Sequence, residues 1–368
     1  MSKVEWKKLG DICKLERGVR VVKKDLQEDG VIPVYQNSLT PLGYYEKSNY
    51  PKNTPFVICA GAAGDVGFCE KPFWAADDCT CVITSNSMNS RYIFYLLQRN
   101  QHFLKSQVRK ASVPRLSKDV IGKICVPILP LPEQNRIVGI LDTFTASIDN
   151  LKEQITQRRK QYDYYRDKLL DLEGKEGVEM KTIGDIAKYR RGSFPQPYGN
   201  SEWYGGEGAM PFVQVADVEE VGMKLKDTTK QYISRMAMPK SVFVPSGSVI
   251  VTLQGSIGKV AITQYDSYVD RTLGIFEGYR IDINKKYFAH QLECVFSEKR
   301  KKARGGTIKT ITKEEFTNFT IPVPSTISQQ LIVDILDIFE ESIQNLEAQL
   351  AGREKQYEYY RNKLLTFE

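Results

Sequence analysis

Residues 159–170 read RKQYDYYRDKLL, and residues 354–365 read EKQYEYYRNKLL. The match extends backward at a constant offset of 195, because IVGILD at 137–142 corresponds to IVDILD at 332–337. Such self-similarity indicates an internal duplication, and a duplication constrains the fold more strongly than any local pattern does. The chain is therefore expected to contain one structural unit twice.

A second pair of matching segments opens each copy. WKKLGDICKLERG at 6–18 corresponds to MKTIGDIAKYRRG at 180–192, at an offset of 174. The offset grows to 195 by the second match, so the second copy holds 21 additional residues between the two. The flanks of the unit are alike and the interiors differ. This pattern indicates a common scaffold that displays a variable part twice.

Apolar residues recur at alternating spacings of four and three along both helical segments. They are Ile137, Leu141, Phe144, Ile148, Leu151 and Ile155, and Ile332, Leu336, Phe339, Ile343, Leu346 and Leu350. The pattern predicts a heptad seam that continues through tyrosines and leucines, with Arg158 and Arg353 as the breaks. At 1.5 Å per residue each helix would be roughly 50 Å long.

A helix with such a seam needs a partner, because its apolar stripe would otherwise face water. The other copy in the same chain is the economical partner, and a folded domain between the copies favours an antiparallel pair. Two separate homodimerising coils are the alternative. The tyrosines at 162, 164, 165, 357, 359 and 360 are expected to serve helix packing or a partner surface rather than base stacking.

The segments before the helices contain short β-rich runs, such as 55–59 and 249–253, separated by Gly, Asn and Pro. Helical patches at 91–109 and 286–302 interrupt them. We therefore predict an α+β protein with two mixed α/β domains, at 1–132 and 178–327, in a pseudo-twofold arrangement. The long helices, at 133–173 and 328–368, separate the domains and form an antiparallel intramolecular coiled coil.

Composition excludes several protein classes. The chain has 368 residues, 41% of them hydrophobic and 26% charged, and a net charge of +7, which favours a polyanionic partner only weakly. Neither a membrane span nor a signal peptide is evident, so we expect a cytoplasmic protein. The seven cysteines and the two histidines, His102 and His290, do not have the spacing of zinc ligands. We therefore predict that the cysteines are reduced thiols in the core.

Catalytic motifs are missing from the sequence. There is no Gly-x-Ser-x-Gly elbow, and residues 255–259, GSIGK, lack the first glycine and the final Ser or Thr of a phosphate loop. We match them to residues 64–68, GDVGF, which contain no lysine. Two glycines shared between the copies predict a tight turn, with close approach to DNA as the second interpretation. The chain is expected to bind rather than to catalyse, and to hold no metal or cofactor itself.

Basic residues beside amides and hydroxyls recur in both copies. Lys and Arg neutralise phosphates, whereas Arg, Asn and Gln can pair with base edges. The candidate DNA-binding residues are Arg17, Arg20, Lys23, Lys24, Gln36, Asn37, Lys105, Arg109, Lys110 and Arg115, and Arg190, Arg191, Ser193, Gln214, Gln254, Ser256, Lys259, Arg271, Lys299, Arg300, Lys301, Lys302, Arg304 and Thr307. Five of the six residues at 299–304 are basic, so this run is the strongest candidate for contact with the DNA phosphates. Loop amides such as Gln36 and Gln214 also satisfy turns, so both roles stay open for them.

Two repeated motifs carry a family resemblance. Residues 6–12 and 181–186 each lead to an Arg-Gly pair, and residues 126–138, with Pro132 and Gln134, have a weaker twin at 321–333. With these motifs the chain resembles the specificity subunit of type I restriction enzymes over nearly its whole length. One departure is Ser-Gln-Gln-Leu at 328–331, where the first copy has Glu-Gln-Asn-Arg. It alters a helix start and leaves the resemblance intact.

The resemblance implies a sequence-specific subunit for double-stranded DNA. Each domain would be a target-recognition domain for one half of a split, asymmetric target, and the helices would set the gap. Two modification subunits, which bind S-adenosylmethionine, would dock around the helices, and motor-nuclease subunits that use ATP and Mg²⁺ would join through them. The alternatives are a self-contained enzyme and a non-DNA adaptor with a basic surface. A methyl-transfer assay on the isolated chain tests the first, and salt-dependent DNA binding tests the second.

Overall fold

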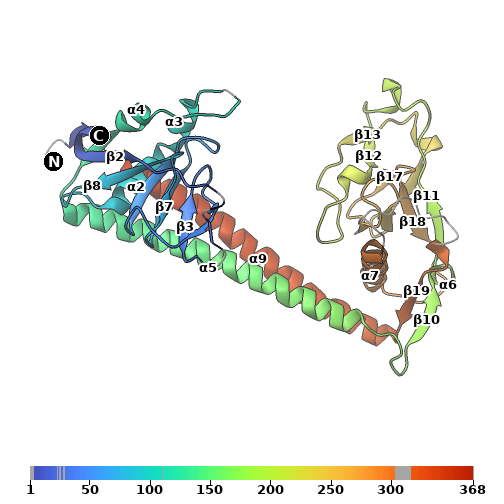
Figure 1. Cartoon of the computed structure of the whole chain (residues 1–368). Coiled ribbons are helices and arrows are strands. Elements are labelled where there is room, and N and C mark those ends of the chain that lie inside the picture. The colour runs from blue at the N-terminus through green and yellow to red at the C-terminus, as the bar shows by residue number, and fades with distance from the viewer. Residues whose placement is uncertain are drawn as a thin grey trace. The chain divides into compact units, whose positions relative to one another are not determined.

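A computed structural model describes residues 4–22, 24, 26–27, 30–110, 112–302 and 316–367, without the side chains of 298–302. The chain divides into two compact units: Met1–Glu153 with Glu347–Glu368, and Gln154–Leu346. Each unit contains one domain of mixed helices and strands and half of each long helix (Figure 1). The prediction of two mixed α/β domains is confirmed. Among the described residues, no helix is long and apolar enough to cross a membrane.

The main sheet of the first domain is antiparallel and has the strand order β2-β8-β5-β6. Its strands are β2 (Cys13–Arg17), β8 (Cys79–Thr84), β5 (Thr54–Ile58) and β6 (Val66–Cys69). All five residues of β5 are buried, because β-branched and aromatic side chains suit a sheet covered on both faces. Helix α2 (Ser90–Arg99) packs against β5 and β6 (Figure 1).

Smaller elements complete the first domain. A second sheet has the order β4-β3-β7, with β3 antiparallel to β4 and parallel to β7. The remaining pair, β1 and β9, is antiparallel. These elements are β1 (Glu5–Lys8), α1 (Leu9–Ile12), β3 (Ile32–Tyr35), β4 (Gly43–Tyr45), β7 (Trp74–Ala75), α3 (Gln101–Ser106), α4 (Lys118–Gly122) and β9 (Cys125–Ile128).

The second domain repeats this topology. Its main sheet has the order β11-β18-β15-β16, and its small sheet has the order β13-β12-β17-β14. The elements are β10 (Glu179–Thr182), α6 (Ile183–Ile186), β11 (Lys188–Arg191), η2 (Ser201–Trp203), β12 (Met210–Val213), η3 (Val215–Asp217), β13 (Gln231–Ile233), η4 (Met238–Lys240), β14 (Val242–Val244), β15 (Val249–Thr252), β16 (Val260–Ile262), β17 (Ser267–Val269), β18 (Leu273–Glu277), α7 (Lys285–Lys302) and β19 (Thr320–Val323). Strand β14 pairs with β17 at the position where the first domain has the isolated bridge of Tyr50 with Phe73.

The two long helices, α5 (Leu131–Leu170) and α9 (Thr326–Leu365), have 40 residues each. In the first unit the rings of Phe144 and Tyr360 stack with centroids 5.2 Å apart, and Lys152 lies 3.4 Å from Glu354. Residues later in α5 contact residues earlier in α9, so the two helices run antiparallel within this unit. In the second unit Tyr165 stacks on Phe339 at 5.4 Å.

The arginines that interrupt the heptad pattern contact aromatic rings of the opposite helix. The guanidinium carbon of Arg353 lies 5.8 Å from the Phe144 centroid in the first unit, and that of Arg158 lies 5.8 Å from Phe339 in the second. Such cation–π contacts keep a cation beside an apolar seam. All twelve expected seam residues are buried or half-buried.

Candidate nucleic-acid interface

Several of the candidate DNA-binding residues lie at one end of the main sheet of the first domain. Strand β2 ends there at Arg17, which pairs with Thr80, and β5 ends at Ile58, which pairs with Cys79. The loops at this end come from different parts of the chain. We call them the first loop cluster: residues 17–19, 36–37, 59–64, 77–78 and 109–115, with 111 outside the described residues.

The two sheets of the first domain are joined within this cluster. The Arg17 Nε donates to the carbonyl of Asp77 at 2.5 Å, and the Gln36 amide lies 3.4 Å from the Asp78 carboxylate. Arg17 is exposed and Gln36 is half-buried. Gln36 therefore has a partner within the loop and still reaches the surface, so turn stabilisation and base contact both remain open for it.

The other side of the first loop cluster is formed by a short hairpin. Arg109 and Arg115 exchange backbone hydrogen bonds of 2.9 and 3.2 Å, and Ala60 forms a bridge with Arg115. The carbonyl of Asn37 accepts from the Ala62 amide at 2.9 Å. Asn37, Arg109 and Arg115 are exposed, so the fold places two arginines and an amide side by side, facing solvent.

The second domain has the corresponding set of loops at the same end of its main sheet, where Arg191 pairs with Gly274 and Thr252 with Leu273. We call residues 191–193, 214–217, 253–258 and 270–272 the second loop cluster. The Asp270 amide donates to the Val213 carbonyl at 3.0 Å. This bond continues the pairing of β12 with β17 as the bond from Ala76 to Tyr35 continues that of β3 with β7, and the Ser193 amide joins the main sheet to it by donating to the Val269 carbonyl at 3.0 Å, as Val19 does to Ala75 in the first domain.

The structural repeat places several candidate residues in equivalent positions. Strand pairing matches Arg17 with Arg191, and Gln36 with Gln214. The backbone amide of Gln214 donates to the buried carboxylate of Asp217 at 2.8 Å. An arginine and a glutamine thus flank both loop clusters, although the sequence around them differs.

The glycine pairs of the turns are also equivalent, but our sequence match between them was wrong. The Gly64 amide donates to Ile58 as the Gly258 amide donates to Thr252. Gly61 and Gly64, rather than 64 and 67, therefore correspond to Gly255 and Gly258. All four have positive φ angles, between 66° and 91°, a region that favours glycine. The predicted tight turn is confirmed.

The glycine of each Arg-Gly pair has a packing role. A Cβ atom on Gly18 would lie 2.2 Å from the carbonyl oxygen of Ala76, and one on Gly192 would lie 2.2 Å from that of Val269. Any side chain would displace the turn that joins the two sheets. The pair therefore holds the adjacent arginine at the cluster, which explains its repetition.

Two predicted lysines have acidic partners. Lys105 lies 2.7 Å from the Asp65 carboxylate, and Lys259 contacts Glu220. Because Asp65 and Lys259 occupy equivalent positions, both pairs lie beside the same turn. These partners would have to be exchanged for phosphate, so the two lysines are weaker candidates than the exposed arginines.

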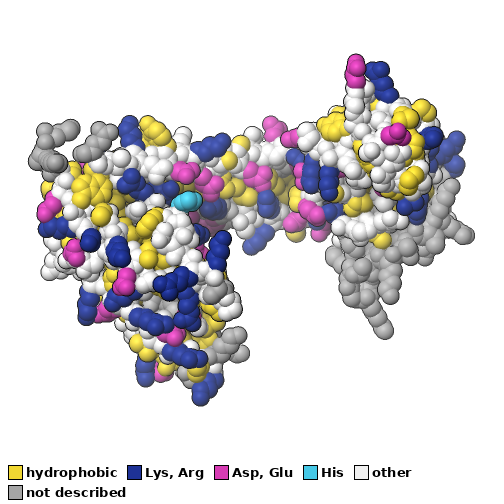
Figure 2. Space-filling view, turned by 90° about the horizontal axis from the view of Figure 1, so that it is seen from above, with side chains coloured by type: hydrophobic (Ala, Val, Ile, Leu, Met, Phe, Trp, Pro, Cys, Tyr) yellow, Lys and Arg dark blue, Asp and Glu magenta, His cyan; other side chains and the backbone are white. Residues whose placement is uncertain are grey.

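The remaining candidates are spread along the edges of the two clusters. Exposed side chains are those of Arg20, Lys24, Lys110, Arg190, Gln254, Ser256 and Arg271. The Ser193 hydroxyl donates to the Lys240 carbonyl at 3.0 Å. Figure 2 shows Lys and Arg side chains over the displayed face of the first domain, with fewer acidic ones between them. Lys23, Arg304 and Thr307, and the side chains of Lys299, Arg300, Lys301 and Lys302, lie outside what the structure describes.

Sequence reasoning missed the joint between the first domain and its long helix. Gln134, fully buried near the start of α5, accepts from the Asn89 amide at 2.8 Å. It donates to the carbonyls of Leu129 at 2.8 Å and Ser87 at 3.1 Å. The Asn89 side chain in turn caps α2. One side chain thus links the starts of α2 and α5.

The second domain has the same joint. Gln329, buried in α9, accepts from the Asn284 amide at 2.9 Å and donates to the Pro324 carbonyl at 2.9 Å. Gln134 and Gln329 are 195 positions apart, and so are Asn89 and Asn284. This constant offset was the signal in the sequence that could have identified the joints. The glutamines of the repeated motif therefore position the domains on the helices.

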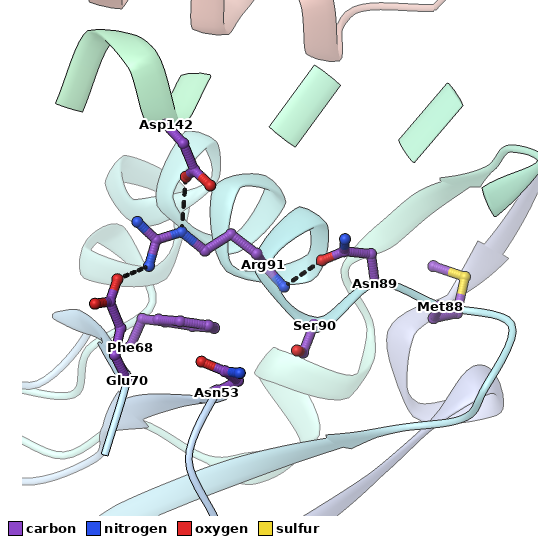
Figure 3. A pocket seen from close by; sticks show the side chains of 8 residues that line it. All are labelled: Asn53, Phe68, Glu70, Met88, Asn89, Ser90, Arg91 and Asp142. Atoms are coloured by element: carbon purple, nitrogen blue, oxygen red, sulfur yellow. Dashed lines mark hydrogen bonds and ion pairs between the residues drawn. The ribbon is translucent and has the colours of Figure 1, made fainter. Parts of the chain in front are cut away.

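A pocket of about 440 Å³ beside the first joint is occupied by its own ion pairs (Figure 3). Arg91 enters it from α2 and donates to Asp142 of α5 at 2.8 Å and to Glu70 at 2.7 Å. Its guanidinium lies 4.7 Å from the Phe68 centroid. Burial is the largest single influence and by itself lowers the pKa of Arg91, but the hydrogen bonds and charges of Asp142 and Tyr95 together outweigh it and raise that pKa. The pocket is a structural junction rather than a ligand site.

The described parts of the two units contain no group of three His, Cys, Asp or Glu side chains placed to hold a metal. All seven cysteines are free, and burial raises the pKa of Cys13 to about 11, which keeps that thiol protonated. Cys125 is exposed, so the prediction of core thiols is wrong for this residue.

Comparison with known proteins agrees with the duplicated architecture. The sequence matches the family described as the type I restriction modification DNA specificity domain over residues 1–158 and 175–352. The chain belongs to this family. The match covers both copies of the repeat, so each copy is one specificity domain, and the chain is a non-catalytic specificity subunit of a type I restriction-modification system.

Individual relatives extend over the full chain. The specificity subunit of the type I restriction enzyme EcoR124I/EcoR124II from Escherichia coli is 31% identical over 99% of this chain and 94% of its own length. A putative type I specificity subunit from Haemophilus influenzae is 28% identical over 100% and 96%. The crystal structure of a type I S subunit from M. genitalium shares the fold with a TM-score of 0.67, at 16% identity, covering 100% and 98%.

Proposed function

We propose that this specificity subunit binds double-stranded DNA and reads a split, asymmetric target, one half with each loop cluster. The observation that carries the proposal is the pair of equivalent clusters. Both present an arginine at the end of a main-sheet strand and a glutamine at the end of a small-sheet strand, at equivalent positions: Arg17 with Gln36 and Arg191 with Gln214. The intervening residues differ, so the two half-sites are expected to differ.

The long helices are proposed to pair as one antiparallel coiled coil that arranges the domains about a pseudo-twofold axis and sets the gap. Contacts within each unit support this, because Phe144 meets Tyr360 in one and Tyr165 meets Phe339 in the other. Forty residues at 1.5 Å per residue correspond to about 60 Å. That length exceeds one turn of B-DNA, about 34 Å, and so allows two half-sites on one face of the duplex.

The partners follow from the same proposal. Two modification subunits, carrying S-adenosylmethionine, would dock around the helices, and motor-nuclease subunits using ATP and Mg²⁺ would join the assembly. The joints at Gln134 and Gln329 support a role for the helices as the common frame, because they fix each domain to a helix start. The chain itself would bind none of these cofactors and would act in the cytoplasm.

Exchange of the second domain tests the proposal. Residues 178–327 are replaced by the corresponding domain of another specificity subunit, and the methylated motif is determined in cells that also express the modification subunit. Only one half of the target is expected to change, with the gap retained. A change in both halves would contradict the modular assignment, and exchange of the first domain instead is the matched control.

A further inference from the structure

One arginine of the second loop cluster lies over an aromatic ring. The guanidinium carbon of Arg271, in the connection between β17 and β18, is 5.0 Å from the centroid of Tyr198. Arg271 is exposed. No described carboxylate forms an ion pair with it within 4.0 Å, unlike Lys259 beside the same cluster. The Tyr198 side chain therefore positions the guanidinium through its ring and its hydroxyl, and no described carboxylate occupies the remaining donors.

The ring under Arg271 is itself fixed. Tyr198 stacks on Phe194 with centroids 5.0 Å apart and planes 28° apart, and its hydroxyl donates to the Asp270 carboxylate. Asp270 is 3% exposed, and its other oxygen accepts from the Thr272 hydroxyl at 2.6 Å. An arginine held on such a platform loses less conformational entropy when it binds than a free one does.

The first domain has a different residue at this position. Asp77 occupies the place of Arg271, and its carbonyl receives the Arg17 side chain. The backbone around both residues is the same, because Cys79 and Leu273 form equivalent bonds to Ala76 and Asp270. The two domains thus carry opposite charges at the same position of the same protein backbone. Such a difference fits a role in distinguishing the two half-sites better than a role in binding the DNA phosphates.

We propose that Arg271, positioned by Tyr198, reads a guanine in the half-target bound by the second domain. The guanidinium fork matches the O6 and N7 acceptors that guanine presents in the major groove. This inference rests on the proposed function and names one base contact within it. Lysine offers the same charge without the fork, so the two roles can be separated by substitution.

The test measures binding of the complex with its modification subunits to duplexes carrying the methylated target. Each guanine of the second half is replaced in turn by 7-deazaguanine, which lacks the N7 acceptor and keeps base pairing. At one position the wild-type complex is expected to lose roughly 5-fold or more in affinity, because one of the two acceptors of a contact that contributes roughly 5- to 150-fold is removed. Arg271→Ala is expected to lose nothing further at that position, Arg271→Lys is expected to keep a smaller effect because an ammonium still reaches these acceptors without the fork, and Tyr198→Leu is expected to weaken the effect.

Controls separate this inference from the proposed function. Lys188→Ala removes the same charge from the opposite end of β11 and is expected to keep the full 7-deazaguanine effect. Thermal unfolding confirms that each variant is folded. The inference is wrong if 7-deazaguanine costs the same in Arg271→Ala as in the wild type, or if the second half-target contains no guanine. Either result leaves a split target, and with it the proposed function, intact.

Discussion

Gln134→Ala is expected to loosen the joint between the first domain and α5. The side chain is fully buried and makes three hydrogen bonds to backbone atoms, those of Asn89, Leu129 and Ser87, of 2.8 to 3.1 Å. Alanine removes all three and leaves one amide and two carbonyls without that partner. At about 1 kcal/mol per hydrogen bond, the free energy of unfolding of this unit should fall by about 3 kcal/mol.

Amide hydrogen exchange under increasing urea measures this locally. Peptides from residues 85–97 report the opening of α2, and about 3 kcal/mol corresponds to roughly 150-fold faster exchange. Gln161→Ala, on an exposed part of α5, is the control and should stay within about 0.5 kcal/mol of the wild type. Unchanged protection in Gln134→Ala would refute the claim that this side chain holds domain and helix together.

A charged variant adds a pH dependence. The carboxylate of Gln134→Glu could accept from Asn89 but could not donate to Leu129 or Ser87, and burial would raise its pKa in the folded state. The unfolded carboxyl ionises near pH ~4.3. The destabilisation should therefore grow as pH rises from there to the folded pKa. If the free energy of unfolding of Gln134→Glu differs from that of the wild type by the same amount at pH 4 and at pH 8, the burial of this group is contradicted.

Three further predictions concern other parts of the chain. Changing Lys301, Lys302 and Arg304 together to Ala should flatten the salt dependence of DNA binding by about 2 to 3 in log–log slope for every sequence; an unchanged slope removes this cluster from the DNA surface. Deleting one heptad from the middle of each long helix shortens it by about 10 Å, so the gap should shrink by about three base pairs; sequencing that finds the old gap would discredit the helices as a ruler. Burial, with help from Lys286 and Arg166, lowers the pKa of His290 to about 3. Stability should therefore fall by about 1.4 kcal/mol per pH unit below pH ~6.5, where the unfolded histidine takes up a proton that the folded one cannot. His290→Phe should abolish this loss in acid unfolding curves, and an unaltered acid limb would place the effect elsewhere.

The sequence could predict those parts of the fold that depend on residue spacing or on a constant offset along the chain. Ile137 and Leu141 mark the helix by their spacing alone, and the offset of 195 finds their counterparts in the second copy. The interiors lack such a pattern. The turn glycines were therefore paired three residues out of register, and only the hydrogen bonds of Gly64 and Gly258 correct the match.

The candidate site depended on contacts between distant residues. Arg271 and Tyr198 are separated by 73 positions, and no spacing rule links a cation to a ring across such a distance in sequence. Lys105 was predicted from the sequence to bind DNA, but in the fold it has an acidic partner, Asp65. Local composition identified the arginines and amides, whereas their partners and their position at one end of the sheet required the structure.

The most direct test of the account is single-molecule methylation sequencing of DNA from cells that express this chain with and without its modification subunit. The account predicts a split, asymmetric motif that appears only when both proteins are present. If both are soluble and associated but no new motif appears, the chain does not direct modification to a DNA sequence, and the central claim is contradicted.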